Sequence, residues 1–105
     1  MIHWRNTLQI APGRQADAVA RLHEWAALAN DHGITIRVFV VTTGTLGRIC
    51  LSADFESMGA REAAFAKANA HPDWIALWAK AMQENRDGTQ PFVPNTAHEE
   101  VWRDA

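Results

Sequence analysis

The stretch IHWRNTLQIAPGRQ, residues 2–15, contains the pattern from which the fold begins. From residue 2 to residue 10 every second side chain is apolar except Asn6, and the side chains between them are polar. A period of two predicts a β-strand with one apolar and one polar face. Pro12 and Gly13 end this strand, because proline lacks a backbone N–H and glycine adopts dihedral angles closed to other residues.

Outward from this stretch, strand and helix patterns follow one another. Apolar residues recur at helical spacing from residue 14 onward, and this pattern predicts an amphipathic helix that ends at Gly33. Two β-branched or alternating runs, 34–43 and 48–55, flank a glycine-containing turn and predict a hairpin. Ser57 is then a suitable N-cap for a second helix.

The stretch NAHPDWIALWAK, residues 69–80, predicts a break in that second helix. Residues before proline avoid helical dihedral angles, so His71 interrupts the helix and Pro72 restarts it. We expect residues 83–97 to form a polar connection and residues 98–103 to form a weak last strand. The order of elements is strand, helix, strand, strand, helix, strand.

This order predicts an α+β protein with a ferredoxin-like βαββαβ sandwich in a single domain, residues 1–105. Its four-stranded antiparallel sheet carries both helices on one face. The other face has no cover within the chain and mixes polar with apolar side chains, so we expect a homodimer packed sheet to sheet, in a dimeric α+β barrel. The residues expected at the dimer interface are Arg5, Arg37, Phe39, Val41, Asp54 and Phe92, the last of them either on a surface loop or on an arm that reaches the partner.

Composition excludes several classes of function. The 10 basic and 12 acidic residues are scattered, so no basic stripe predicts nucleic-acid binding. No apolar run approaches the ~20 residues that a membrane span requires, and no signal peptide is recognisable at the start, so we expect a cytoplasmic protein without a membrane partner. The lone Cys50 is more typical of a small buried side chain than of a nucleophile. The five histidines lack metal-ligand spacing, and we expect neither a metal nor a cofactor.

Two stretches carry a resemblance to a known family: RNTLQIAPGRQADAV, residues 5–19, and FESMGAREAAFAKANAHPDW, residues 55–74. They resemble the NIPSNAP-like proteins of the dimeric α+β barrel superfamily, whose relatives include antibiotic biosynthesis monooxygenase-type proteins. The resemblance implies the fold and a homodimer, and it is compatible with cofactor-free monooxygenase chemistry. The superfamily also includes haem-degrading relatives, in which an asparagine and a histidine match Asn6 and His71. Their tryptophan upstream of the histidine is missing here, and the absence of tyrosine excludes any mechanism that uses a phenol side chain.

Asn6 is the polar exception on the apolar face of the first strand. A buried amide without a partner costs about 1–3 kcal/mol. Its side chain therefore either bonds to a neighbouring residue or holds a ligand in a cavity between sheet and helices.

His71, Trp4, Trp74 and Trp78 complete the predicted site. His71 is either a helix joint or, at the rim of a pocket, a proton-transfer group that acts beside Asn6. The three tryptophans are either core residues or the walls of a site for a flat apolar molecule.

The leading hypothesis is a small-molecule binding protein with cofactor-independent monooxygenase-type or proton-transfer chemistry; whether it is an enzyme stays open. The alternatives are a non-catalytic dimerisation or interaction module with a filled core, and a haem-binding or haem-degrading protein.

Overall fold

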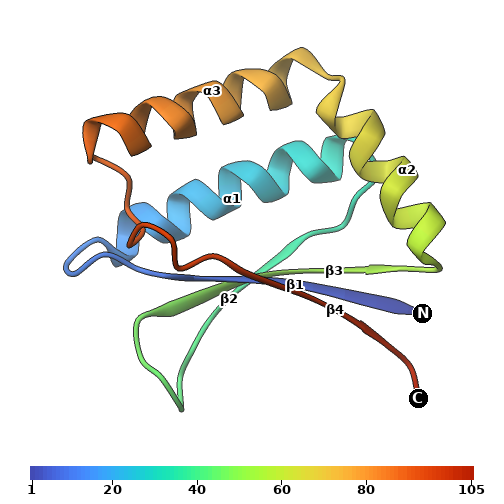
Figure 1. The fold of residues 1–105 in the computed structure, drawn as a ribbon, viewed down its shortest axis with the longest axis horizontal. Helices are drawn as coiled ribbons and strands as arrows, with labels where there is room; N and C mark the ends of the chain where they lie inside the picture. Colours follow the sequence, from blue (N-terminus) through green and yellow to red (C-terminus); the bar gives the residue numbers. More distant parts are fainter.

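Three helices cover one face of a twisted four-stranded sheet (Figure 1). The computed structural model describes all residues, Met1–Ala105. Its elements are β1 (Ile2–Gln9), α1 (Gln15–Asp31), β2 (Arg37–Val40), β3 (Arg48–Phe55), α2 (Met58–Asn69), α3 (Pro72–Asp87) and β4 (His98–Arg103). The strands lie in the order β2-β3-β1-β4, and every neighbouring pair is antiparallel. The predicted α+β class and ferredoxin-like order are confirmed, with the second helix divided in two.

The division between α2 and α3 has the predicted local cause. Ser57 caps α2, where its Oγ accepts a hydrogen bond from the Ala60 N–H at 3.1 Å. His71 has extended backbone dihedrals and caps α3, with Nδ1 accepting from the Asp73 N–H at 3.2 Å. Pro72 occupies the first turn of α3, where its missing N–H has no intrahelical partner to lose.

Two predicted boundaries were wrong. The connection expected at 83–97 is shorter, because α3 continues to Asp87 before Gly88 ends it in a left-handed conformation. The polar residues of this last turn pair along the helix, with Gln83 donating to Asp87 at 2.9 Å. β2 is also shorter than the run 34–43, because Ile34 and Ile36 are buried in an irregular segment before the strand.

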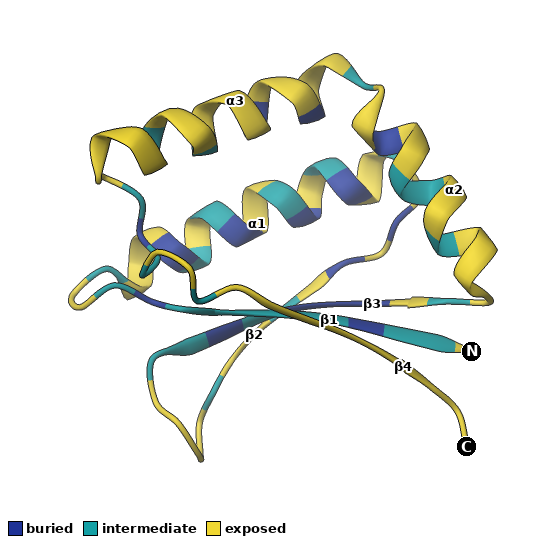
Figure 2. Cartoon of the chain, viewed as in Figure 1, coloured by how far each residue is buried: buried dark blue, intermediate teal, exposed yellow.

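The core lies between α1 and the two central strands. Figure 2 shows buried residues recurring along α1 and β3, whereas β4 is exposed along its length. In register, Trp4 pairs with Ala53 on β3 and Asn6 pairs with Leu51, so these side chains share the helix-facing side of the sheet. No helix has both the length and the apolar character needed to cross a membrane.

Candidate functional site

A cavity of about 670 Å³ lies between the sheet and the helices. α3 makes its main contacts with the other helices and not with the sheet, so the space between α3 and β1 stays open. Fourteen of the 23 residues that line this cavity are hydrophobic. Its size and walls match those of sites for small organic molecules, which fall in the range of about 300–1,000 Å³.

Tryptophan side chains form much of the apolar wall. Trp4, Trp74 and Trp78 all line the cavity, and Trp25 of α1 joins them. The Trp25 ring meets those of Trp74 and Trp78 edge to face, with centroids 4.9 and 5.1 Å away. Trp74 is buried, whereas Trp78 is 51% exposed, so the aromatic wall reaches the surface at Trp78. Trp25 is one of the apolar residues of the predicted amphipathic helix, and its position in this wall was not predicted.

Asn6 faces the cavity from the middle of β1, as its place in the alternation predicted. Its Oδ1 is buried and accepts no hydrogen bond from any protein group. The indole N–H groups of Trp4 and Trp74 are likewise buried without a partner. Each such group is left with a desolvation cost of about 1–3 kcal/mol, which a ligand with matching polar atoms would offset. The interpretation that a neighbouring residue satisfies the Asn6 oxygen does not hold.

One ion pair lies in the cavity wall. Arg61 of α2 donates from Nη2 to Glu99 Oε1 of β4 at 2.7 Å, and its guanidinium lies over the Phe65 ring at 5.4 Å from the centroid. The Arg61 side chain is only 19% exposed, since α2 turns it toward β4. These two residues are the only ionisable ones that line the cavity. Glu99 pairs with Asn6 in the sheet register. The alternation of side chains along β4 was the signal that could have placed Glu99 on the cavity side of the sheet.

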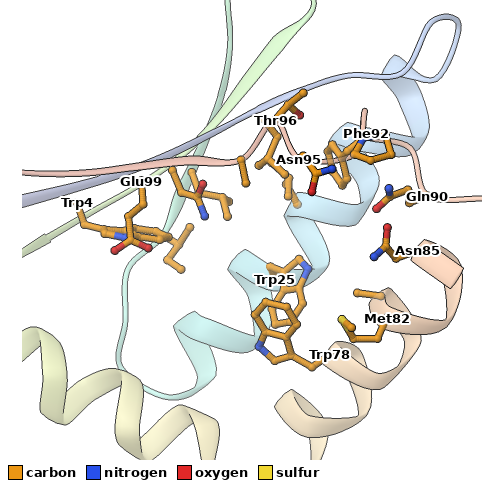
Figure 3. Close-up of a pocket in the computed structure, with 18 of the residues that line it drawn as sticks. Trp4, Trp25, Trp78, Met82, Asn85, Gln90, Phe92, Asn95, Thr96 and Glu99 are labelled. Atoms are coloured by element: carbon orange, nitrogen blue, oxygen red, sulfur yellow. The ribbon is translucent and has the colours of Figure 1, made fainter. Parts of the chain in front are cut away.

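The two ends of the cavity differ in chemistry. Figure 3 shows Trp4 and Glu99 at one end and the amide side chains of Asn85 and Gln90 at the other, with Trp25 between them. The far end is closed by the connection before β4, in which Phe92 forms a bridge with Ile10. The cavity therefore has an ionic end, an aromatic middle and an end with neutral amides.

A family model described as NIPSNAP matches residues 6–90 of the chain. The chain belongs to the NIPSNAP family. A search of curated proteins found no match to it.

Solved structures similar to this NIPSNAP chain include two proteins of the same family. An uncharacterized NIPSNAP domain protein from Burkholderia xenovorans is 15% identical, with a TM-score of 0.76 over 100% of this chain and 95% of that one. A NIPSNAP family protein with unknown function from Agrobacterium tumefaciens is 19% identical, with a TM-score of 0.74 over 100% and 88%. A putative antibiotic biosynthesis monooxygenase from Deinococcus radiodurans is 13% identical, with a TM-score of 0.66 over 100% and 93%. At these identities the likeness shows the ferredoxin-like fold of the NIPSNAP chain.

His71 does not line the cavity of this NIPSNAP chain. Its Nδ1 is engaged with the Asp73 N–H, and its ring lies 4.1 Å from the ring of His32, centroid to centroid, at the end of α1. The structure thus brings Asn6 together with Trp4, Trp74 and Trp78 but leaves His71 at the helix joint. A catalytic role for His71 stays a prediction that this geometry does not favour.

The outer face of the sheet holds most of the residues expected at a dimer interface of the NIPSNAP chain. Arg5 and Asp54 form an ion pair on this face, with Nη1 and Oδ1 3.5 Å apart. His3, which the sequence did not connect to them, bonds through one ring nitrogen to Asp54 at 2.8 Å and through the other to Asp104 at 2.6 Å. The hydrogen bonds to Asp104 and Asp54 raise the pKa of His3, and the same contacts lower the pKa of both carboxyl groups.

The remaining interface candidates divide between the two faces. Arg37 and Phe39 lie on β2 opposite Ser52 and Cys50 and are exposed, and Val41 follows them, half-buried. Phe92 packs against the core of its own chain and lines the cavity, so its expected contact with a partner has no support here. No group of three or more His, Cys, Asp or Glu side chains in the NIPSNAP chain is arranged so that it could hold a metal ion.

Proposed function

We propose that this NIPSNAP protein binds a small, mostly apolar organic molecule in the cavity between sheet and helices. One observation carries the proposal: Asn6 lines a largely hydrophobic cavity, and its buried Oδ1 has no protein partner. A protein interior normally satisfies or excludes such a group, because leaving it unpaired is costly. A ligand of mixed character would fill the apolar volume and pair with Asn6 and the two indole N–H groups.

Chemistry on the bound molecule is a second step of the same proposal. The chain shares its fold with the putative antibiotic biosynthesis monooxygenase from Deinococcus radiodurans. This likeness supports cofactor-independent monooxygenase-type or proton-transfer chemistry as the class to test. Glu99 is the only carboxylate in the cavity wall, and we assign any proton transfer in the cavity to it. The alternative of an interaction module with a filled core is not favoured, since a cavity of about 670 Å³ lies between the sheet and the helices. A haem-handling role loses its predicted ligand, since His71 lies outside the cavity.

Binding is tested with N-phenyl-1-naphthylamine, a neutral probe that becomes fluorescent in apolar surroundings. We expect saturable emission from the native protein. Ala81→Trp, which places an indole in the cavity wall, should abolish the signal. Ala79→Trp is the matched control on the same helix, because Ala79 is exposed and outside the wall. Absence of saturable emission, or equal emission from both variants, would reject the proposed site.

We further propose that the protein is a homodimer that packs through the outer face of the sheet. This face exposes 48% of Phe39 and 59% of Trp102 beside the His3 and Arg5 ion pairs, a mixture of apolar and paired polar groups that suits burial against a second copy. Light scattering should give twice the chain mass at micromolar concentration, and Phe39→Asp should shift the mass toward the monomer. A monomeric mass for the native protein would contradict the dimer.

A further inference from the structure

We infer that the preferred ligand carries one anionic oxygen group, and that Arg61 binds this group in the position that the Glu99 carboxylate takes in this structure. The inference rests on the proposed function, since it names the chemical class that the same cavity selects. It assigns Arg61 as the residue that determines specificity and Glu99 as an internal substitute for the ligand.

Arg61 has more hydrogen-bonding capacity than its surroundings use. A guanidinium carries five N–H donors and keeps its charge at all accessible pH values. In the cavity wall, Nη2 donates to Glu99, but the buried Nε–H has no hydrogen-bond partner. A cation at 19% exposure needs a counter-charge, and an anionic ligand oxygen would supply both the charge and acceptors for the remaining donors.

The unpaired groups in the wall favour an acceptor-rich ligand. Three buried donors lack partners: the Arg61 Nε–H and the indole N–H groups of Trp4 and Trp74. Among the unpaired buried atoms of the wall, Asn6 Oδ1 is the single acceptor. This excess of donors suits a carboxylate, enolate or phenolate oxygen and does not suit an ammonium group.

Glu99 is placed so that a ligand can displace it. Its side chain is 50% exposed and extends from the exposed edge strand β4, so water can solvate the carboxylate once it leaves Arg61. Ion pairs with one exposed partner contribute little to stability, so the exchange costs little. Because Glu99 neighbours Asn6 in the sheet register, the displacing group arrives beside the unpaired amide.

Two matched probes test this assignment. 8-Anilinonaphthalene-1-sulfonate and N-phenyl-1-naphthylamine share one ring system, and only the first carries an anionic oxygen group. Arg61→Gln should weaken binding of the sulfonate about tenfold or more, the loss expected for a charged hydrogen bond, and change binding of the neutral probe less than about twofold. Arg61→Lys should recover part of the sulfonate affinity, and Glu99→Gln should raise that affinity above the native value.

The control variants separate these effects from general changes in charge. Lys67→Gln removes a cation from the exposed side of α2, and Glu100→Gln removes an anion from the opposite face of β4, next to Glu99. Neither should change the ratio of the two affinities by more than about twofold. Displacement of the neutral probe by 1-naphthoate but not by 1-naphthamide should give the same preference for a carboxylate.

The outcomes distinguish the inference from the proposed function. If the neutral probe binds and Ala81→Trp blocks it, but Arg61→Gln leaves the sulfonate affinity unchanged or weakens both probes equally, the assignment of Arg61 is wrong and the binding site stands. Retention of the sulfonate by Ala81→Trp would place the anion outside the cavity and also overturn the inference. If the neutral probe does not bind at all, the proposed function fails and the inference fails with it.

Discussion

The two faces of the sheet treat polar side chains in opposite ways. On the outer face, His3, Arg5 and Asp54 are partly exposed and are paired with one another. On the helix-covered face, Asn6 lies one residue away along the same strand, yet its buried oxygen has no protein partner. The open face could leave its polar groups to water and nevertheless pairs them, whereas the covered face leaves the Asn6 oxygen unpaired although water cannot reach it. The difference is consistent with the proposed ligand-binding role of the inner groups, and it separates them from the ion pairs of the outer face.

The largest contrast is expected between neighbours on β3. Leu51 is buried on the helix face and lines the cavity, while Cys50 is half-buried on the outer face. Leu51→Ala should lower the free energy of unfolding by about 3 kcal/mol, the usual cost of truncating a core leucine. Cys50→Ala should lower it by less than about 1 kcal/mol. Urea unfolding measures both, and equal losses would show that the outer face is packed as tightly as the core.

Ion pairs should show the next largest contrast. Arg21 of α1 and Glu84 of α3 are joined by two hydrogen bonds of 2.8 and 2.6 Å, and their side chains are only 11% and 20% exposed. Glu84→Gln should cost about 1–2 kcal/mol, because it leaves a largely buried guanidinium with only the more distant Glu24, at 3.7 Å, as a charge partner. Asp54→Asn, in the more exposed outer pair, should cost less than about 1 kcal/mol. A larger loss for Asp54→Asn in urea unfolding would reverse the contrast.

Two adjacent positions on β1 should give effects of opposite sign. Asn6→Leu replaces the unpaired amide by an apolar side chain of similar size and should raise the free energy of unfolding by about 1 kcal/mol. Thr7→Val removes a hydroxyl that accepts a 2.6 Å hydrogen bond from Arg48 on the outer face, and should lower it by a similar amount. Thermal or urea unfolding without added ligand measures both. Destabilisation by Asn6→Leu would mean that the amide has a structural partner after all.

The smallest effect concerns the pH dependence of the outer face. The raised pKa of His3 makes its contribution complete below the unfolded value near 6.5, and the contribution is lost as pH rises through the folded pKa. The lowered pKa values of Asp54 and Asp104 make their contribution complete above about 4, and it is lost at lower pH. The native protein should therefore exceed His3→Gln in stability mainly between about pH 4 and 6.5. A difference that is constant from pH 3 to 9 would contradict the assignment.

Local signals in the sequence predicted the framework well. Alternation identified β1 and placed Asn6 and Trp4 on the covered face, and the His71-Pro72 pair located the helix joint, because strand periodicity and proline geometry act over a few residues. Wall residues that depend on the distance between α3 and the sheet were missed. The cavity location of Arg61 follows from a contact between α2 and β4 that no local pattern encodes, whereas alternation along β4 could have placed Glu99 on the cavity side. The position of Phe92 in the cavity wall was also not predicted, since it depends on a bridge to Ile10 across most of the chain.

The connection before β4 has a consequence for the evolution of ligand preference. Thr96 anchors it by accepting from the Gln9 N–H at 3.1 Å and donating to the Val93 carbonyl at 2.6 Å, while Gln90 and Asn95 contribute side chains to the cavity wall. Neither of these amides belongs to the buried core on which folding depends. Substitutions there can change the shape and polarity of the site while the anchor keeps the segment in place. Substitutions at these two positions are thus expected to alter the proposed ligand selectivity with little loss of stability.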